Sequence, residues 1–145
     1  MTQITDNYIA TGKVVYIFKN FPLPASMHPQ AQISAEAAEC GGPQGKFWEM
    51  HDKVFLSQDE WSGKTNALEI LLGYAAGVGL DESAYQTCMS EHHMAQKIQN
   101  DYAYGQRIGV PATPAFLING KGMTGAQPYD VFQQVIEGEL GGGQP

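Results

Sequence analysis

The sequence predicts an α/β fold, in which strands near the two ends of the chain are separated by a helical middle. Residues 13–21 form an almost continuous apolar run, and a shorter run at residues 114–119 ends in Asn119-Gly120. Continuous apolar runs are typical of strands covered on both faces, and Asn-Gly is typical of a hairpin turn. Apolar residues between the two runs recur at helical spacing. Strands at both ends with helices between them indicate layers of sheet and helix.

Glycine and proline residues divide the first half of the chain into predicted elements. Residues 2–11 resemble the last turns of a helix that stops at Gly12, and the strand at residues 13–21 ends at Pro22 and Pro24. An alanine-rich helix is expected from Pro29 to Cys40. The next helix, residues 44–57, carries an apolar stripe made of Phe47, Met50, His51, Val54 and Phe55.

The second half is predicted in the same way. Asn66 with Glu69 suggests one capped helix start, and Asp81 suggests another. Residues 91–107 are expected to form one longer helix that leads into the strand at 114–119 and its hairpin partner. A last helix begins at Pro128, and residues 141–145, GGGQP, are expected to be a flexible tail.

Composition excludes several function classes. The net charge is −7 and only 8 Lys and Arg are scattered along 145 residues, which argues against a nucleic-acid or anionic-membrane partner. No apolar run approaches the roughly 20 residues that span a bilayer. The first residues show no signal-peptide pattern, so a cytoplasmic location is the default expectation. We expect no cofactor, because no glycine-rich loop has phosphate-binding spacing.

The two cysteines, Cys40 and Cys88, form no CxxC motif. They lack zinc-finger spacing, and adjacent His92 and His93 point apart on a helix, so no metal site is expected. Either the cysteines pair with each other or both are free and buried. Cys40 lies at a helix C-terminus near acidic residues, which disfavours a reactive thiolate and indicates a structural role.

The chain resembles the DsbA-like thiol–disulfide oxidoreductases, a branch of the thioredoxin fold with an inserted helical domain. The matching stretches are GKVVYIFKNFPL (12–23), HPQAQISAEAAEC (28–40), QGKFWEMHDKVF (44–55), YAAGVGLD (74–81), the Cys88 position and GVPATPAFLINGK (109–121). The resemblance implies one domain at residues 1–140, with residues 13–21 and 109–140 as the thioredoxin part and residues 28–108 as a mainly helical insertion.

The resemblance also implies roles for particular residues. Thr113-Pro114 would be the family's cis-proline bond, and the loop around it would bind the backbone of a substrate. The substrate-binding residues would be Val110, Pro111, Ala112, Thr113 and Pro114. Cys40 and Cys88 would match a second, non-catalytic disulfide that some family members carry in the helical insertion.

The chain departs from the family pattern in one respect. The family's chemistry resides in a CxxC at the start of a helix that follows the first, central strand, and the 145 residues contain neither that strand nor the motif. No catalytic residue is therefore assigned, and the expected fold is an incomplete thioredoxin-like fold with an inserted helical subdomain. The absent strand would leave exposed strand edges, which favour pairing with another chain. We therefore expect a homodimer formed by joined or exchanged strands.

Three functions remain open. The chain is a peptide- or protein-binding domain without family-type redox activity, an oxidoreductase whose CxxC segment is truncated or supplied elsewhere, or a purely structural interaction module held together by subunit exchange. The first two would take peptides or unfolded proteins as partners. The resemblance implies a periplasmic or extracellular location, in contrast to the cytoplasmic default.

Overall fold

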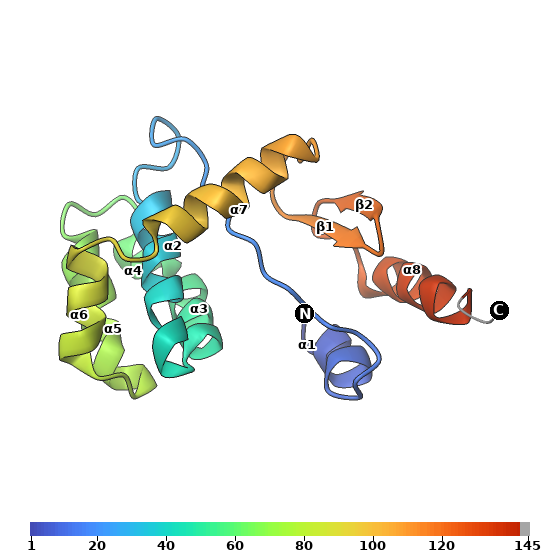
Figure 1. The fold of residues 1–145 in the computed structure, drawn as a ribbon, viewed down its shortest axis with the longest axis horizontal. Coiled ribbons are helices and arrows are strands. Elements are labelled where there is room, and N and C mark those ends of the chain that lie inside the picture. The colour runs from blue at the N-terminus through green and yellow to red at the C-terminus, as the bar shows by residue number, and fades with distance from the viewer. Residues whose placement is uncertain (143–145) are drawn as a thin grey trace. The chain divides into compact units, whose positions relative to one another are not determined.

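The computed structural model describes residues 1–142 and divides into two compact units (Figure 1). Unit 1 comprises Met1–Phe18 together with the chain from Gly105 onward, and unit 2 comprises Lys19–Tyr104. The resemblance predicts a helical insertion at residues 28–108 with the thioredoxin part around it. Each unit has its own core, so the two are described separately.

Unit 2 is helical. Its elements are α2 (Ala31–Cys40), the 3₁₀ turn η2 (Gly42–Gln44), α3 (Phe47–Leu56), α4 (Gln58–Trp61), α5 (Ala67–Val78), α6 (Glu82–Ser90) and most of α7 (Ala95–Arg107). One apolar cluster joins α2, α3, α4, α5 and α6, and it includes Met50, Leu71 and Tyr85. The buried Trp61 ring fills part of this core, and its Nε1–H donates a 2.9 Å hydrogen bond to the Val54 carbonyl. The indole is therefore buried without leaving its polar atom unpaired.

Unit 1 combines helices with a two-stranded hairpin. Its elements are α1 (Thr2–Ile4), the π-helical turn η1 (Thr5–Ile9), β1 (Ala115–Ile118), β2 (Lys121–Thr124) and α8 (Tyr129–Gly141). The strands are antiparallel, and Ile118 pairs with Lys121 across the turn. Tyr8, Phe132 and Ile136 form the buried core of this unit, against which side chains of β1 and β2 pack. The core of unit 1 is thus much smaller than that of unit 2.

Local sequence signals predicted the hairpin correctly. Asn119 and Gly120 both have positive φ, 46° and 88°, as a tight two-residue turn requires. Asp81 also caps α6 as expected, since its Oδ1 accepts a 2.7 Å bond from the Ala84 N–H. Asn66 precedes α5, but its side chain makes no capping hydrogen bond.

The strand predicted at residues 13–21 does not form. The backbone there belongs to no sheet, and within residues 1–142 the only sheet is the β1–β2 pair. The prediction that both faces would be covered was also wrong, because Val15 is 85% exposed and Ile17 is 70% exposed. Their neighbour Val14 packs against the unit 1 core, so side chains alternate as in extended backbone. The apolar run therefore indicated extended backbone correctly but could not supply a hydrogen-bonding partner.

Several helix boundaries and faces also differ from the prediction. α7 begins at Ala95 rather than residue 91, because His92 has φ 54° and interrupts the helix. The helix predicted from Pro29 begins at Ala31. On the α3 stripe Met50 is buried but Phe55 is 60% exposed. α8 continues to Gly141, inside the predicted tail at 141–145, and residues 143–145 lie outside the described residues.

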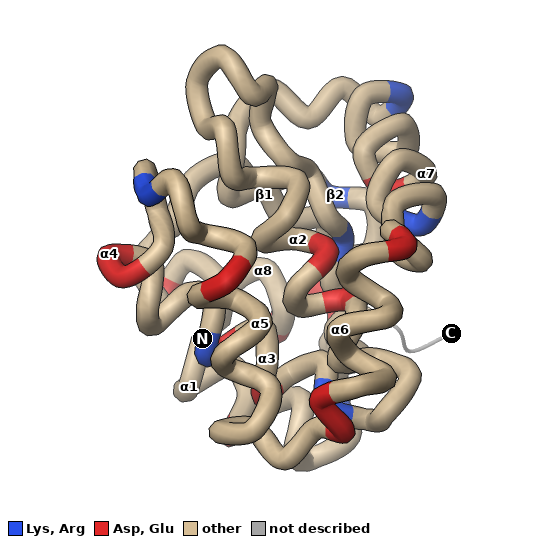
Figure 2. Tube along the Cα trace, turned by 90° about the vertical axis from the view of Figure 1, so that its left-hand side faces the viewer, with Lys and Arg blue, Asp and Glu red and all other residues tan. Residues whose placement is uncertain are grey.

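Charge is dispersed over the chain. Acidic residues outnumber basic ones, and neither sign gathers on one element (Figure 2). Among residues 1–142, no helix has both the length and the apolar character needed to cross a bilayer.

Candidate functional site

The loop before β1 is held at both ends and exposed between them. Gly109 has φ 74°, a conformation that suits glycine, and it turns the chain after α7. The Val110 N–H donates a 3.0 Å bond to the Gly105 carbonyl, and the Pro114 carbonyl accepts a 2.7 Å bond from the Gly125 N–H. The Thr113–Pro114 peptide bond between these anchors is cis. Residues 111–114 are all exposed, so their backbone lies on the surface of unit 1.

The edge of β1 continues this exposed backbone. Two hydrogen-bonded pairs, Pro114 with Gly125 and Ile118 with Lys121 at the turn, fix the alternation of the hairpin. In an antiparallel pair every second residue directs its N–H and C=O away from the partner strand. In β1 these residues are Ala115 and Leu117. The Leu117 side chain is 51% exposed. A backbone edge of this kind can accept an added strand through main-chain hydrogen bonds.

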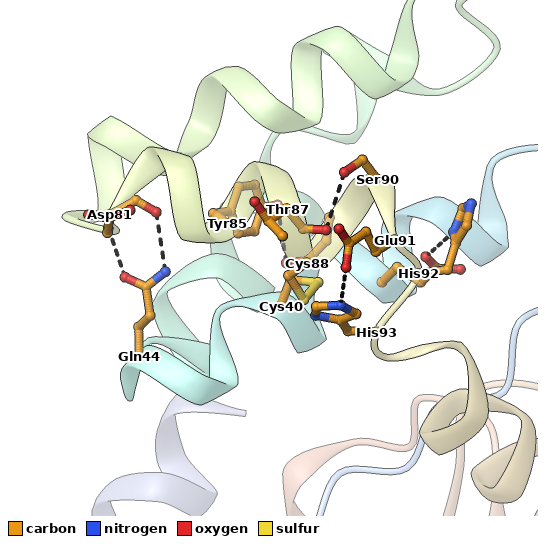
Figure 3. The surroundings of a disulfide bond; sticks show 12 residues. Cys40, Gln44, Asp81, Tyr85, Thr87, Cys88, Ser90, Glu91, His92 and His93 are labelled. Carbon is orange, nitrogen blue, oxygen red and sulfur yellow. Dashed lines mark hydrogen bonds and ion pairs between the residues drawn. A yellow bond between two sulfur atoms is a disulfide. The ribbon is translucent and has the colours of Figure 1, made fainter.

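Cys40 and Cys88 form a disulfide that joins α2 to α6, as the resemblance implied. Their Cα atoms are 5.8 Å apart, and both residues are buried. Figure 3 shows the bond enclosed by α2, α6 and the turn that carries His92 and His93. The Tyr85 hydroxyl donates a 3.2 Å bond to the Ala37 carbonyl beside it, and burial raises the pKa of this phenol. Because both cysteines are buried, the bond is a poor target for an attacking thiolate.

Carboxylates flank the disulfide on α2. Glu36 is buried and accepts a 2.8 Å bond from Gln32 Nε2 and a 2.7 Å contact from His92 Nδ1. Glu39, the residue before Cys40, is buried as well. Negative charge next to a thiol disfavours the thiolate. This arrangement supports a structural role for the disulfide rather than a nucleophilic one.

The two predicted sites belong to different units. The loop Val110–Pro114 belongs to unit 1 and the disulfide belongs to unit 2. His93 contacts Glu91, and within residues 1–142 no group of three His, Cys, Asp or Glu side chains is arranged to hold a metal ion. Unit 2 also has an open cavity of about 450 Å³ that contains none of the predicted site residues; it is lined by Pro22, Pro24, Gln32, Ala95, Ile98, Gln99 and Tyr102.

The sequence analysis does not predict a partly buried charged cluster in unit 2. It consists of Lys19, Asn20, Glu39, Lys97 and Asp101. A signal was present, because Lys19-Asn20 interrupts an otherwise apolar run. The partners could not be identified from sequence, since Asn20 and Asp101 are 81 positions apart.

A sequence family described as "Thioredoxin" matches residues 1–138. Curated relatives include "Na(+)/H(+) antiporter NhaA 1" of Salinispora arenicola, 32% identical over 127 residues that cover 88% of this chain and 19% of the relative. "Na(+)/H(+) antiporter NhaA 3" of Salinispora tropica is 36% identical over 118 residues, which cover 81% of this chain and 17% of that protein. The chain therefore spans only about a fifth of the length of these relatives.

Solved structures that share the fold include one from Wolbachia pipientis and one from Bacillus subtilis. Wolbachia pipientis alpha-DsbA1 has a TM-score of 0.79 and 27% identity, and the match covers 97% of this chain and 75% of that one. BdbD from Bacillus subtilis, in its oxidised form, has a TM-score of 0.83 and 22% identity, with coverage of 97% and 76%. At this lower identity, the likeness to BdbD shows the fold alone.

Proposed function

Because the chain belongs to the DsbA-like thioredoxin-fold family, we propose that it is a peptide-binding domain that does not itself exchange thiols and disulfides. Membership of this family supports a disulfide-related function in the coarse sense. The antiporter name belongs to much longer polypeptides, of which this chain matches about a fifth, and it is not carried over.

One observation supports the part of the proposal that this chain has no redox chemistry of its own. The 145 residues contain two cysteines, and both are consumed in the buried Cys40–Cys88 bond. Family-type exchange needs a thiolate, which a helix N-terminus or a neighbouring cation would stabilise. Cys40 instead ends α2 beside buried carboxylates. An oxidising compartment, such as the periplasmic or extracellular setting of the family, would preserve this bond.

The binding part of the proposal is supported by the loop Val110–Pro114 and the β1 edge. They present contiguous backbone, with exposed Leu117 beside it, to an extended peptide. Strand addition draws its affinity from main-chain hydrogen bonds, which suits binding of many unrelated sequences. The substrates proposed are therefore extended segments of peptides or unfolded proteins.

The substitution Ala112→Glu is expected to weaken binding of a carbamidomethylated, permanently unfolded test protein by about tenfold, the order of one lost interaction of about 1.4 kcal/mol. It adds bulk and negative charge to the exposed loop. Ala126→Glu, at an exposed position between β2 and α8, is the matched control and should bind like the wild type. Titration by fluorescence anisotropy measures both. Equal affinity of the two variants, or no binding by the wild type, would contradict the proposal.

An insulin-reduction assay distinguishes the oxidoreductase alternative. The 145-residue protein should leave insulin unreduced in the presence of a dithiol. Activity that disappears in Cys40→Ser and Cys88→Ser variants that remain folded would instead assign the reaction to this disulfide.

A second candidate function, a subunit-exchanged interaction module, rests on residues 13–18, in which Val15 and Ile17 are exposed. Val15 and Ile17 place apolar side chains in solvent on a segment that belongs to no sheet. We propose that two copies associate through this region. Size-exclusion chromatography with light scattering at high micromolar concentration should then give twice the 15.8 kDa chain mass, and Val15→Lys with Ile17→Lys should restore the single-chain mass. A wild-type protein that stays at 15.8 kDa under these conditions rules this candidate out.

A further inference from the structure

The charged cluster in unit 2 joins three segments of the chain. Glu39 on α2 accepts hydrogen bonds of 2.5 Å from both Asn20 Nδ2 and Lys97 Nζ. Asp101 on α7 lies 2.7 Å from Lys19 Nζ and 3.3 Å from Lys97 Nζ. The backbone N–H and the side-chain amide of Asn20 also donate to Asp101 Oδ2, each at 3.3 Å. The cluster thus contains two carboxylates, two ammonium groups and one asparagine that donates to both carboxylates.

Each of these interactions involves at least one buried group. Asp101 is 4% exposed and both Asn20 and Glu39 are buried, whereas the two lysine side chains remain about half exposed. Burial by itself raises the pKa of Asp101, but hydrogen bonds from Lys19 and Asn20 and the charge of Lys97 outweigh it, so the pKa lies below its ordinary value. Burial likewise lowers the pKa of Lys97, and Glu39 and Asp101 more than reverse that effect. Both pKa shifts favour the charged forms of Asp101 and Lys97.

The cluster lies where the chain leaves unit 2. Lys19 is the first residue of this unit and Tyr104 is its last, so the two connections to unit 1 depart from Lys19 and from the end of α7. The first connection is extended backbone, and the second is continuous helix. Within unit 2 the two are held side by side, because the Phe21 and Tyr102 rings have centroids 4.6 Å apart and Lys19 Nζ lies 6.0 Å from the Tyr104 ring centroid.

We propose that the cluster of Lys19, Asn20, Glu39, Lys97 and Asp101 is a lock that fixes the extended connection against α7 and thereby restricts the motion of unit 1 relative to unit 2. A single helical connection can bend, and Gly105, the first residue of unit 1, lies within α7 as an intrinsically weak helix position. A second connection tied to the same helix removes that freedom. Releasing the tie frees the extended connection from α7. This lock is independent of the peptide-binding loop.

Pulsed electron paramagnetic resonance tests the lock. A keto amino acid that carries the spin label replaces exposed Gln133 on α8 and exposed Glu82 on α6. Labelling a ketone rather than a thiol leaves the disulfide intact. Asp101→Asn should broaden the distance distribution and should raise the hydrogen-exchange rate of the Asn20 amide at least about tenfold, since the amide loses a charged acceptor. Glu139→Gln, which breaks the Lys121–Glu139 pair inside unit 1, is the matched control and should change neither quantity.

Lys19→Met is a second variant that tests the lock even if Asp101→Asn does not fold. Its side chain is 53% exposed, so its replacement should be tolerated, and the distribution should broaden in the same direction as in Asp101→Asn but less. A folded Asp101→Asn protein with a distribution as narrow as the wild type overturns the lock. If that variant does not fold, an unchanged distribution in Lys19→Met does so. Broadening without faster exchange at Asn20 also overturns it, because the connection would then have stayed in place.

Discussion

Replacing both cysteines, as Cys40→Ala with Cys88→Ala, is expected to lower the free energy of unfolding by about 4 kcal/mol. The disulfide closes a loop between residues 48 positions apart, and in the chain-entropy model its loss restores that freedom to the unfolded chain. The substitution also removes buried sulfur atoms that join α2 to α6. A loss of this size corresponds to a decrease of roughly 8–16 °C in Tm for a chain of this length.

Differential scanning calorimetry measures this change. Ser90→Ala, at an exposed position on α6 close to Cys88, is the matched control and should leave Tm within about 2 °C of the wild type. Reduction of the wild-type protein should reproduce the effect of the double substitution. A Tm that responds to neither treatment would mean that the bond does not constrain the fold.

Phe132→Ala is expected to cost about 3–5 kcal/mol and to unfold unit 1 before unit 2. Phe132 is one of three residues in the buried core of unit 1, and its ring meets Phe116 of β1 edge-on at a centroid distance of 4.8 Å. So small a core cannot compensate for the lost contacts. The β1–β2 hairpin and the loop before it should therefore lose protection together.

Hydrogen exchange with mass spectrometry separates the two units. In Phe132→Ala the amides of β1, β2 and α8 should exchange rapidly, while those of α5 remain protected and binding of the unfolded test protein is lost. Phe55→Ala removes a 60% exposed ring from α3 and serves as the control, with exchange close to that of the wild type. Equal loss of protection in both units would show that they unfold as one.

Local signals predicted local structure well. The turn at Asn119-Gly120 and the cap at Asp81 depend on a few adjacent residues, and both have the expected geometry. The prediction at residues 13–21 was wrong for the complementary reason: a strand exists only if a second segment accepts its hydrogen bonds, and sequence pattern does not specify that segment. Similarly, Asn66 resembles a cap but makes no capping bond.

The candidate site was predicted in the same uneven way. The loop Val110–Pro114 was identified from a resemblance, and the structure adds that its backbone is exposed and continues into the free edge of β1. Its role in binding remains a prediction. The polar cluster around Asp101 was not predicted at all, although Lys19-Asn20 stood out in an apolar run.

Residue type and short spacing were enough to predict the helical middle, the hairpin and the two cysteines available for a disulfide. The three-dimensional structure was needed to find that Val15 and Ile17 face solvent and that Asn20 bonds to both Glu39 and Asp101. Burial of a charge is stable only where opposite charges and hydrogen-bond donors converge on it from other segments. Lys97 lies one turn from Asp101 on the same helix, but the donors Lys19 and Asn20 are 82 and 81 positions away, and no local pattern records a convergence over such a distance.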